Sequence, residues 1–270
     1  MPFRRLAGLF LPGLAFLCLT AVLRADISVG LASFVDDSQV HILWPAADWH
    51  VNQLIWTGTA WVDQDLTAAA GNAAFSGWGS PLMSYSFNGW RYVVYVDTNQ
   101  HINQMVWTGT AWVNQDLTAA GGYAALAAAG STLTNLIDGN GPHIIYVDAI
   151  QHVNQLIWTG AAWVNQDVTA AAGSTVAVSA GSGLTSFVDG SHVNIAYIDS
   201  NQHVSQLLWT GTQWVNQDLT AASGAPYPLP GSAITSVLLA DGPHLVYVDA
   251  NHTSIRCFIR MQKVSGITTT

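Results

Sequence analysis

The chain has 270 residues, of which 50% are hydrophobic and only 9% are charged, and its mean hydropathy is +0.29. Such a composition excludes a chain kept unfolded by its charge. The net charge is −9, and Arg91 is the only basic residue between Arg24 and Arg256, which argues against binding to nucleic acid or to an anionic membrane surface. Glu is absent while Trp, Val, Thr and Gly are plentiful, so the composition favours β-structure.

The N-terminal segment 1–25 has the features of a secretory signal peptide. Two arginines precede an uncharged stretch, residues 6–23, and Ala25 stands at a candidate cleavage site. An uncleaved membrane anchor is the alternative, since about 18 apolar residues are the least that span a bilayer. A Pro-Gly pair within the stretch favours cleavage. We therefore expect a secreted or periplasmic protein, whose mature chain keeps only Cys257 and has no intramolecular disulfide.

A repeat of 51 residues dominates the rest of the chain. Each copy contains a His-x-x-Gln segment, then Trp-Thr-Gly, then a Trp-Val-x-Gln-Asp segment. The Trp-Thr-Gly copies begin at Trp56, Trp107, Trp158 and Trp209. Repeats with periods of about 20–50 residues indicate stacked or radially arranged units.

Each unit carries four predicted strands. In the third unit these are residues 133–137, 143–148, 152–158 and 162–169. Tight turns with positive φ are expected where Asn-Gly or Asp-Gly joins the first two strands. These pairs are Asn88-Gly89, Asp138-Gly139, Asp189-Gly190 and Asp241-Gly242. Four antiparallel strands in roughly 50 residues are typical of a β-propeller blade. We therefore predict an all-β fold, a β-propeller that occupies residues 26–270; a β-sandwich, the alternative, would not need such a repeat.

The second strand of each unit indicates how many blades there are. A hydrophobic residue followed by Tyr or Trp recurs at 43–44, 94–95, 145–146, 196–197 and 246–247. The fifth unit lacks Trp-Thr-Gly, and residues 254–270 carry three basic residues and a cysteine in its place. We expect about five blades with a degenerate last blade. The segment 254–270 is either a diverged blade or a truncated or frameshifted end, and we expect it to be the most poorly packed part of the domain.

Neutral polar side chains and tryptophans recur at fixed places in the units. A Gln lies in the third strand, a polar residue stands 12 positions earlier in the second, and a Trp begins the fourth. These residues are His41, Gln53, Trp61, Tyr92, Gln104, Trp112, His143, Gln155, Trp163, Asn194, Gln206 and Trp214. Amides and imidazoles beside an indole suit a hydroxyl-rich ring, whose C–H face lies on the aromatic plane. The alternative is that the polar groups satisfy the backbone and the indoles pack between blades. Because the grouping is repeated, we predict several weak carbohydrate-binding sites.

The same repeats argue against metal, cofactor and enzyme sites. One His per unit, with neither Cys nor Glu beside it, does not assemble a metal site, and we find no nucleotide-binding loop or nucleophile motif. A glycosidase would need two suitably spaced Asp, and a sialidase would need several Arg. The repeated Asp65, Asp116, Asp167 and Asp218 accept hydrogen bonds either from a sugar or from a backbone N–H, and the second is favoured. We expect no enzyme and no cofactor.

The repeat resembles the blade of the fucose-specific lectin superfamily of fungal and bacterial propellers, and more loosely that of tachylectin-type propellers. It consists of aromatic-hydrophobic-Asp, a turn, hydrophobic-x-Gln-x-x-Trp, then Gly and Trp, over residues 31–252. The resemblance implies sites built from a strand-two Arg, a strand-three Glu and aromatics of adjoining blades. Here Gln53, Gln104, Gln155 and Gln206 stand at the Glu place, and His41, Tyr92, His143 and Asn194 stand near the Arg place.

Together these features lead to one functional expectation and one alternative. We expect a secreted lectin with repeated glycan sites between blades, and fucose or related sugars are the ligands that the resemblance implies. The alternative is a non-catalytic propeller scaffold for protein–protein interaction that has lost sugar binding.

Overall fold

The computed structural model describes residues 30–36, 39–190, 192–240 and 242–251. The predictions for the signal segment 1–25 and for residues 254–270 lie outside these ranges. Within them the fold consists of β-sheets and four short helices of one turn each. No helix in the described ranges has the length and apolar character needed to cross a membrane.

The predicted four-stranded antiparallel sheets are confirmed, and we call them blades 1 to 4 in chain order. Blade 1 contains β1 (Ala32–Asp36), β2 (Gln39–Pro45), β3 (Val51–Trp56) and β4 (Trp61–Asp65). Blade 2 contains β5 (Leu82–Phe87), β6 (Trp90–Val96), β7 (Ile102–Trp107) and β8 (Trp112–Asp116). Blade 3 contains β9 (Leu133–Ile137), β10 (Pro142–Val147), β11 (Val153–Trp158) and β12 (Trp163–Asp167). Blade 4 contains β13 (Leu184–Asp189), β14 (His192–Ile198), β15 (Val204–Trp209) and β16 (Trp214–Asp218). A fifth, two-stranded sheet consists of β17 (Ile234–Leu239) and β18 (Gly242–Tyr247).

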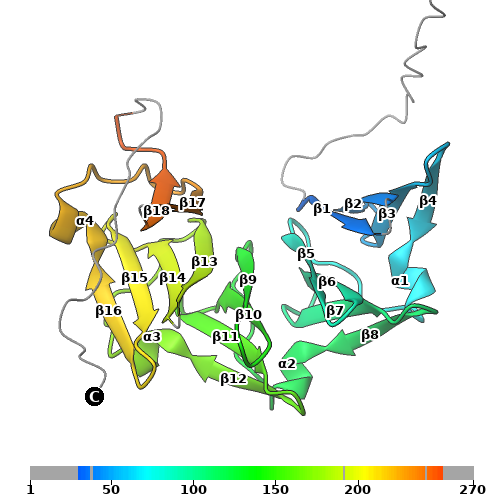
Figure 1. Ribbon diagram of the computed structural model, residues 1–270, viewed down its shortest axis with the longest axis horizontal. Helices are drawn as coiled ribbons and strands as arrows, with labels where there is room; N and C mark the ends of the chain where they lie inside the picture. Colours follow the sequence, from blue (N-terminus) through cyan, green and yellow to red (C-terminus); the bar gives the residue numbers. More distant parts are fainter. Residues whose placement is uncertain (1–29, 37–38, 191, 241, 252–270) are drawn as a thin grey trace, which may run out of the picture.

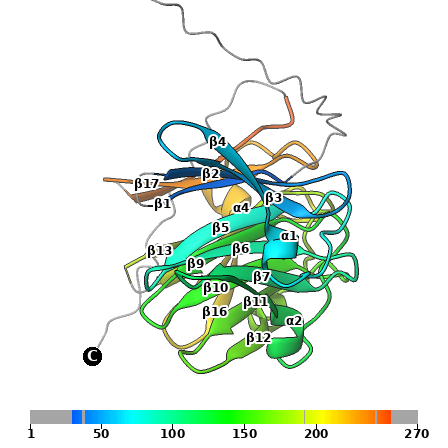
Figure 2. The ribbon, with the colours of Figure 1, turned by 90° about the vertical axis from the view of Figure 1, so that its right-hand side faces the viewer.

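The blades follow one another along an arc with their first strands innermost (Figure 1). Contacts between β1 and β5, β5 and β9, β9 and β13, and β13 and β17 join the inner strands. In the described residues the arc is open between blade 1 and the sheet β17–β18 (Figure 1). Since the strands alternate in direction, each turn between the second and third strands lies at the same end of a blade as the connection to the next blade. We call this end the connection face; α1 (Leu66–Ala69) and α2 (Leu117–Ala120) lie on it together (Figure 2).

The fourth strand is shorter than predicted. In the third unit it ends at Asp167, and residues Val168–Ala171 form the helix α3, although the sequence pattern extended the strand to residue 169. The carboxylate of Asp167 accepts a hydrogen bond from the N–H of Ala170 at 2.8 Å and so caps the helix. The same capping opens α4 (Leu219–Ser223) of blade 4. The favoured expectation for the repeated Asp, that it caps a backbone N–H, is confirmed.

The expected tight turn at Asn88-Gly89 is present, with φ of 50° and 78°. At Asp138 the prediction of a tight Asp-Gly turn is wrong, because Ile137 pairs with Pro142 and leaves a loop of four residues. The Asp138 carboxylate accepts hydrogen bonds from the N–H groups of Asn140 and Gly141 within this loop. Partial burial pushes the pKa of Asp138 up, but these N–H groups and the nearby His143 hold it below its usual value.

The hydrophobic core lies between the blades. Trp112 of blade 2 packs among residues of blade 1, Trp163 of blade 3 among residues of blade 2, and Trp214 of blade 4 among residues of blade 3. These three indoles are 6–8% exposed. Trp61 holds the same place in blade 1, where no described blade precedes it, and it is 48% exposed. The strand-four tryptophan is therefore the side chain that joins each blade to the one before it.

Buried tyrosines tie blades 2 and 3 and the fifth sheet to the connections that precede them. Tyr95, Tyr146 and Tyr247 each donate a hydrogen bond of 2.7 Å to a backbone carbonyl 21 residues earlier, at Ala74, Ala125 and Pro226. Their rings are at most 1% exposed. Burial is the main cause that raises the pKa of Tyr95 and Tyr146, and the nearby aspartates raise it further.

Removal of one strand-four indole tests the role of the inter-blade contact. Trp163→Ala is expected to lower the free energy of unfolding by about 3–5 kcal/mol, because it leaves a cavity between two blades. Trp61→Ala, the matched control at the same repeat position, is expected to cost about 1 kcal/mol or less. Urea denaturation of both variants measures the difference, and equal losses would contradict the inter-blade role.

The buried tyrosines predict a loss of stability in alkali. A folded-state pKa above the unfolded value of about 10 contributes stability that is fully present below pH 10 and is lost as the pH rises beyond it. The phenolate would be buried and could no longer donate to its carbonyl. We expect the urea midpoint to fall as the pH rises above about 10. Tyr146→Phe should be less stable at neutral pH but lose less on going to alkali; an unchanged slope would count against this explanation.

Candidate functional site

A chain of neutral hydrogen bonds crosses the interface between blades 3 and 4. Nδ1 of His143 lies 3.0 Å from Oε1 of Gln155, and Nε2 of Gln155 donates to Oε1 of Gln166 at 2.7 Å. Nε1 of Trp214, in the next blade, donates to the same Gln166 oxygen at 3.1 Å. Gln155 and Gln166 are cross-strand partners, so both side chains project from the sheet face that meets blade 4.

Blade 1 repeats the His–Gln–Gln part of this arrangement. Nδ1 of His41 lies 2.8 Å from Oε1 of Gln53, and Nε2 of Gln53 donates to Gln64 at 2.6 Å. Since that donation fixes which end of the Gln53 amide faces the imidazole, Nδ1 of His41 is the donor in their hydrogen bond. The His41 Nε2 atom is buried and has no hydrogen-bond partner among the described residues. The ring of Phe34 stacks on the imidazole at 4.3 Å.

Blades 2 and 4 vary the strand-two partner. Gln104 of blade 2 accepts from the hydroxyl of Tyr85 at 3.3 Å, while Tyr92 stacks parallel on Tyr85 at 4.5 Å. Burial, and to a smaller extent Tyr92, raises the pKa of the Tyr85 hydroxyl, which therefore remains a donor at neutral pH. In blade 4 the direction is reversed, since Nε2 of Gln206 donates to Oδ1 of Asn194 at 2.5 Å.

The predicted residues thus meet, but in a different grouping from that of one sequence repeat. Trp163 and Gln155 belong to the same repeat and project from opposite faces of blade 3. Each interface joins the polar residues of one blade to the strand-four indole of the next. The groups so formed are His41 and Gln53 with Trp112, Tyr92 and Gln104 with Trp163, and His143 and Gln155 with Trp214. Asn194 and Gln206 face the fifth unit, whose outer strands lie outside the described residues, and Trp61 faces no described blade.

These groups are buried. The four strand-three glutamines are 1–3% exposed, and His41, His143 and Asn194 are 4–7% exposed. The strand-three tryptophans, Trp107, Trp158 and Trp209, are partly exposed and lie against the buried strand-four indoles with ring centroids 5.6–5.7 Å apart. The accessible aromatic surface at each interface therefore belongs to strand three.

Sequence reasoning missed the strand-four glutamines, Gln64, Gln115 and Gln166. Each accepts a hydrogen bond from the strand-three Gln at 2.6–2.7 Å. The signal was present in the sequence, because these residues recur in Trp-Val-x-Gln-Asp, 11 positions after the strand-three Gln. A hairpin around Thr-Gly places the two amides opposite one another.

Four His–Asp pairs stand on the connection face. Nδ1 of the His that precedes each third strand lies 2.5–2.8 Å from the Asp that ends each fourth strand. The pairs are His50–Asp65, His101–Asp116, His152–Asp167 and His203–Asp218. The other oxygen of each Asp caps the helix that follows, so the pair ties a strand to a helix start. No group of three or more His, Cys, Asp or Glu suited to a metal occurs in the described ranges.

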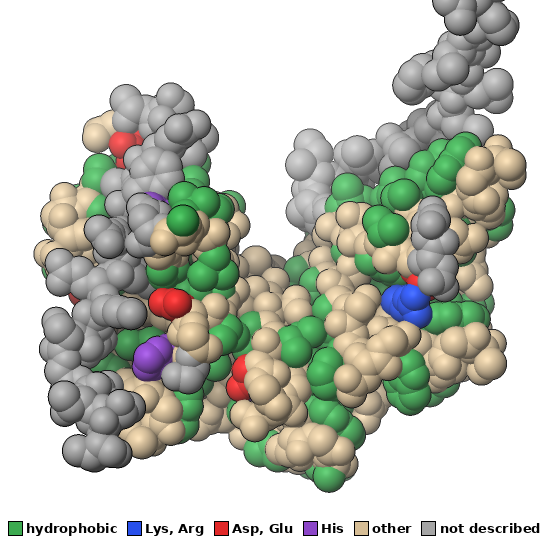
Figure 3. Space-filling view, in the orientation of Figure 1, with side chains coloured by type: hydrophobic (Ala, Val, Ile, Leu, Met, Phe, Trp, Pro, Cys, Tyr) green, Lys and Arg blue, Asp and Glu red, His purple; other side chains and the backbone are tan. Residues whose placement is uncertain are grey.

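Charged side chains are sparse on the surface, as the space-filling view shows (Figure 3). Arg91 of blade 2 forms an ion pair with Asp36 of blade 1 and donates to the carbonyl of Gly89 at 2.7 Å. The one Arg of the repeats thus serves an inter-blade contact. Neutral groups would supply most contacts to a ligand.

Comparison with known proteins identifies the fold. No protein-family model matches the chain, and no curated protein matches it. Solved structures do: AofleA from Arthrobotrys oligospora has a TM-score of 0.59 at 15% identity over 84% of this chain and 67% of its own. The six-bladed fungal lectin of Aleuria aurantia has a TM-score of 0.59 at 16% identity, over 88% of this chain and 81% of its own. The BP39L lectin of Burkholderia pseudomallei has a TM-score of 0.57 at 14% identity, over 82% of this chain and 64% of its own.

These matches confirm the β-propeller fold and the resemblance to propeller lectins that the repeat indicated. The chain spans about two thirds of AofleA and four fifths of the Aleuria aurantia lectin. Two of the three proteins are described as lectins. The chain has the fold of the fungal and bacterial propeller lectins.

The capping aspartates provide a stability test of the His–Asp pairs. Asp116→Ala removes the helix cap at Ala119 and the contact with His101, and is expected to cost about 1–2 kcal/mol of unfolding free energy. Asp116→Asn keeps a capping oxygen and loses only a partly exposed contact, so its cost should be below about 1 kcal/mol. Thermal unfolding of the two variants measures the difference, and equal losses would show that the cap contributes little.

Proposed function

We propose that this protein is a secreted lectin that binds neutral sugars at the interfaces between adjacent blades. The observation that carries the proposal is the chain of neutral hydrogen-bonding groups that ends on an indole of the next blade, as from His143 through Gln155 and Gln166 to Trp214. Amides, imidazoles and indoles are the groups that bind hydroxyl-rich rings. The signal-like segment 1–25 supports export.

The sugar would approach from the partly exposed strand-three indole of each interface. Its ring would stack there, and its hydroxyls would reach the amides behind. In blade 1 the buried Nε2 of His41 has no hydrogen-bond partner among the described residues, and a sugar hydroxyl would supply one. The Aleuria aurantia lectin has been solved with alpha-methyl-L-fucoside, which makes fucosides the first ligands to test. Because Gln and His replace a charged pair, we propose a broader preference for neutral sugars.

One observation favours the alternative of a protein-binding scaffold. The glutamines are only 1–3% exposed and their amides already bond to one another, so these amides have partners without a ligand. On that alternative the polar groups fix the spacing of the blades and no sugar binds.

A glycan array probed with the mature protein, followed by calorimetry with the best ligand, separates the two functions. Gln155→Leu removes the amide at a single interface and is expected to lower the stoichiometry by one site while the other sites keep their affinity. Gln213→Leu, at an exposed turn, is the matched control and should bind like the wild type. The lectin function would be refuted if no glycan on the array binds, and the interface sites would be refuted if Gln155→Leu keeps full stoichiometry.

A further inference from the structure

A pocket of about 280 Å³ opens on the connection face, where blades 1, 2 and 3 meet. Its walls come from the turn after β2, the connection into β5, the turn after β6 and the connection into β9. Trp49, Trp78, Pro81 and Val96 give it an apolar lining, and Thr98 and Gln100 add polar groups. It lies at the opposite end of the blades from the Trp-Thr-Gly turns and is separate from the polar chains between the blades.

The two indoles of this pocket break the repeat. Gln100, Gln151 and Gln202 stand where blade 1 has Trp49, and Ala129, Ala180 and Pro230 stand where the first connection has Trp78. Trp49 is 44% exposed and Trp78 is 74% exposed. Large apolar side chains that are exposed together at one place commonly mark a binding surface.

The backbone does not need Trp49. This residue has a φ of 72°, a left-handed conformation that is costly for a bulky side chain. Gln100, Gln151 and Gln202 adopt the same conformation with φ of 63–66°, so glutamine makes the turn equally well. Two hydrogen bonds from Ser76, from its N–H at 2.8 Å and its hydroxyl at 3.0 Å, hold the Trp49 carbonyl. Trp49 thus occupies a costly backbone conformation in a turn that glutamine forms equally well. We infer that the indole ring itself has a role there.

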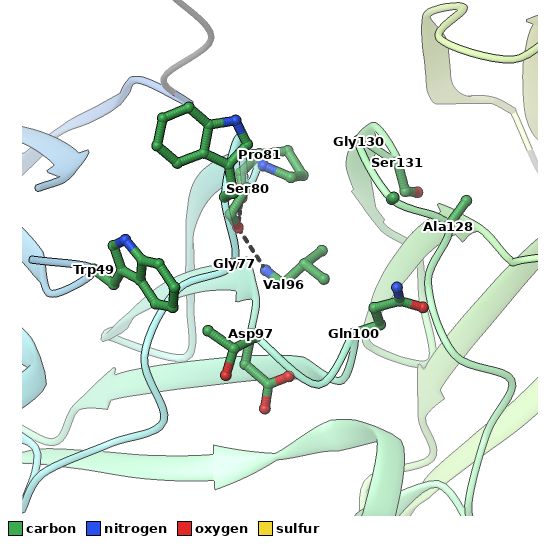
Figure 4. Close-up of a pocket in the computed structure, with 13 residues that line it drawn as sticks. Trp49, Gly77, Ser80, Pro81, Val96, Asp97, Gln100, Ala128, Gly130 and Ser131 are labelled. Carbon is green, nitrogen blue, oxygen red and sulfur yellow. Dashed lines mark hydrogen bonds between the residues drawn. The ribbon is translucent and has the colours of Figure 1, made fainter. Parts of the chain in front are cut away.

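The polar groups of the pocket are neutral and available. Figure 4 shows Trp49 and Gln100 on two sides of the pocket, with Val96 between them. The side chains of Thr98 and Gln100 have no hydrogen-bonded partner among the described residues, whereas Gln202, the counterpart in blade 4, donates to Ser179 at 3.2 Å. The available groups are therefore a hydroxyl and an amide, which both donate and accept.

The charge of the pocket does not favour a cation. Asp97 is its one charged lining residue and is 4% exposed. Its carboxylate already accepts three hydrogen bonds of 2.8–2.9 Å, from the N–H groups of Asn99 and His101 and from the amide of Asn103. The carboxylate is occupied in holding the turn, and a ligand would meet indoles, a hydroxyl and an amide instead.

We propose that this pocket is a second kind of binding site, present once in the described arc, for a single neutral pyranose ring. The C–H face of the sugar stacks on an indole, and its hydroxyls bond Gln100 and Thr98. The site lies apart from the repeated interface sites and does not depend on them. Its position on the connection face would let one glycan chain be held by two different surfaces of the same molecule.

The test uses the tryptophan indole N–H resonances of the 15N-labelled mature protein. Probes are alpha-methyl-L-fucoside, methyl galactoside, methyl mannoside and N-acetylglucosamine, each at millimolar concentration. Trp49→Gln and Trp78→Ala place the residues of other repeats at these positions, so both variants should fold, and each assigns one resonance. At least one sugar should shift both indole resonances, and either variant should weaken that binding roughly tenfold.

Further variants separate this pocket from the interface sites. Gln155→Leu should leave the Trp49 and Trp78 shifts unchanged. Gln151→Trp combined with Ala180→Trp, at two positions that do not line this pocket, should create a second such pocket two blades along. If none of the four sugars shifts either indole, the pocket proposal is overturned, whatever the array shows for the interfaces. Shifts caused by tetramethylammonium but not by sugars would overturn the assignment to carbohydrate.

Discussion

The insertion of one indole into the preceding blade is the contact on which the rest of the structure depends. The four-stranded sheets of blades 2 to 4 have apolar residues on both faces, and each packs against a neighbour on both sides. Trp112, Trp163 and Trp214 fill the space between consecutive sheets and are almost fully buried, while Trp61 at the open end of the arc is half exposed. Because the sheets diverge outward from the inner strands, a large side chain on the fourth strand fills the widest part of the interface.

This packing also determines which polar residues meet. At the interface between blades 3 and 4 the indole N–H of Trp214 reaches across and donates to Gln166 of the previous blade. A functional group in this fold is therefore shared by two repeats, and its indole stands 59 positions after its strand-three Gln in the sequence. The buried amides are satisfied by one another, which avoids the cost of unpaired polar groups and fixes the relative position of adjacent sheets.

Much of the fold could be predicted from the sequence, because a 51-residue repeat with hairpin turns leaves few architectures. The strands of the third unit were predicted to within one residue at most ends. The end of the fourth strand was missed because Val168 and Thr169 favour strands, whereas the cap from Asp167 starts a helix there. The grouping of the candidate residues could not be predicted, since residue spacing does not say which face of a sheet meets which neighbour.

Departures from a repeat carry information that the repeat itself does not. The residues that all blades share have structural roles that every blade needs: packing against neighbouring blades, forming turns and capping a helix. Trp49 and Trp78 are explained by none of these, because Gln and Ala at the same places build the same turn and connection. Exposed indoles lose the free energy that their burial would have contributed, and nothing in the local backbone compensates for that loss. The tryptophans that recur in strand four of blades 2 to 4 are buried between sheets. Trp49 and Trp78 are instead exposed to solvent around one pocket, so they are the indoles best placed to contact a ligand.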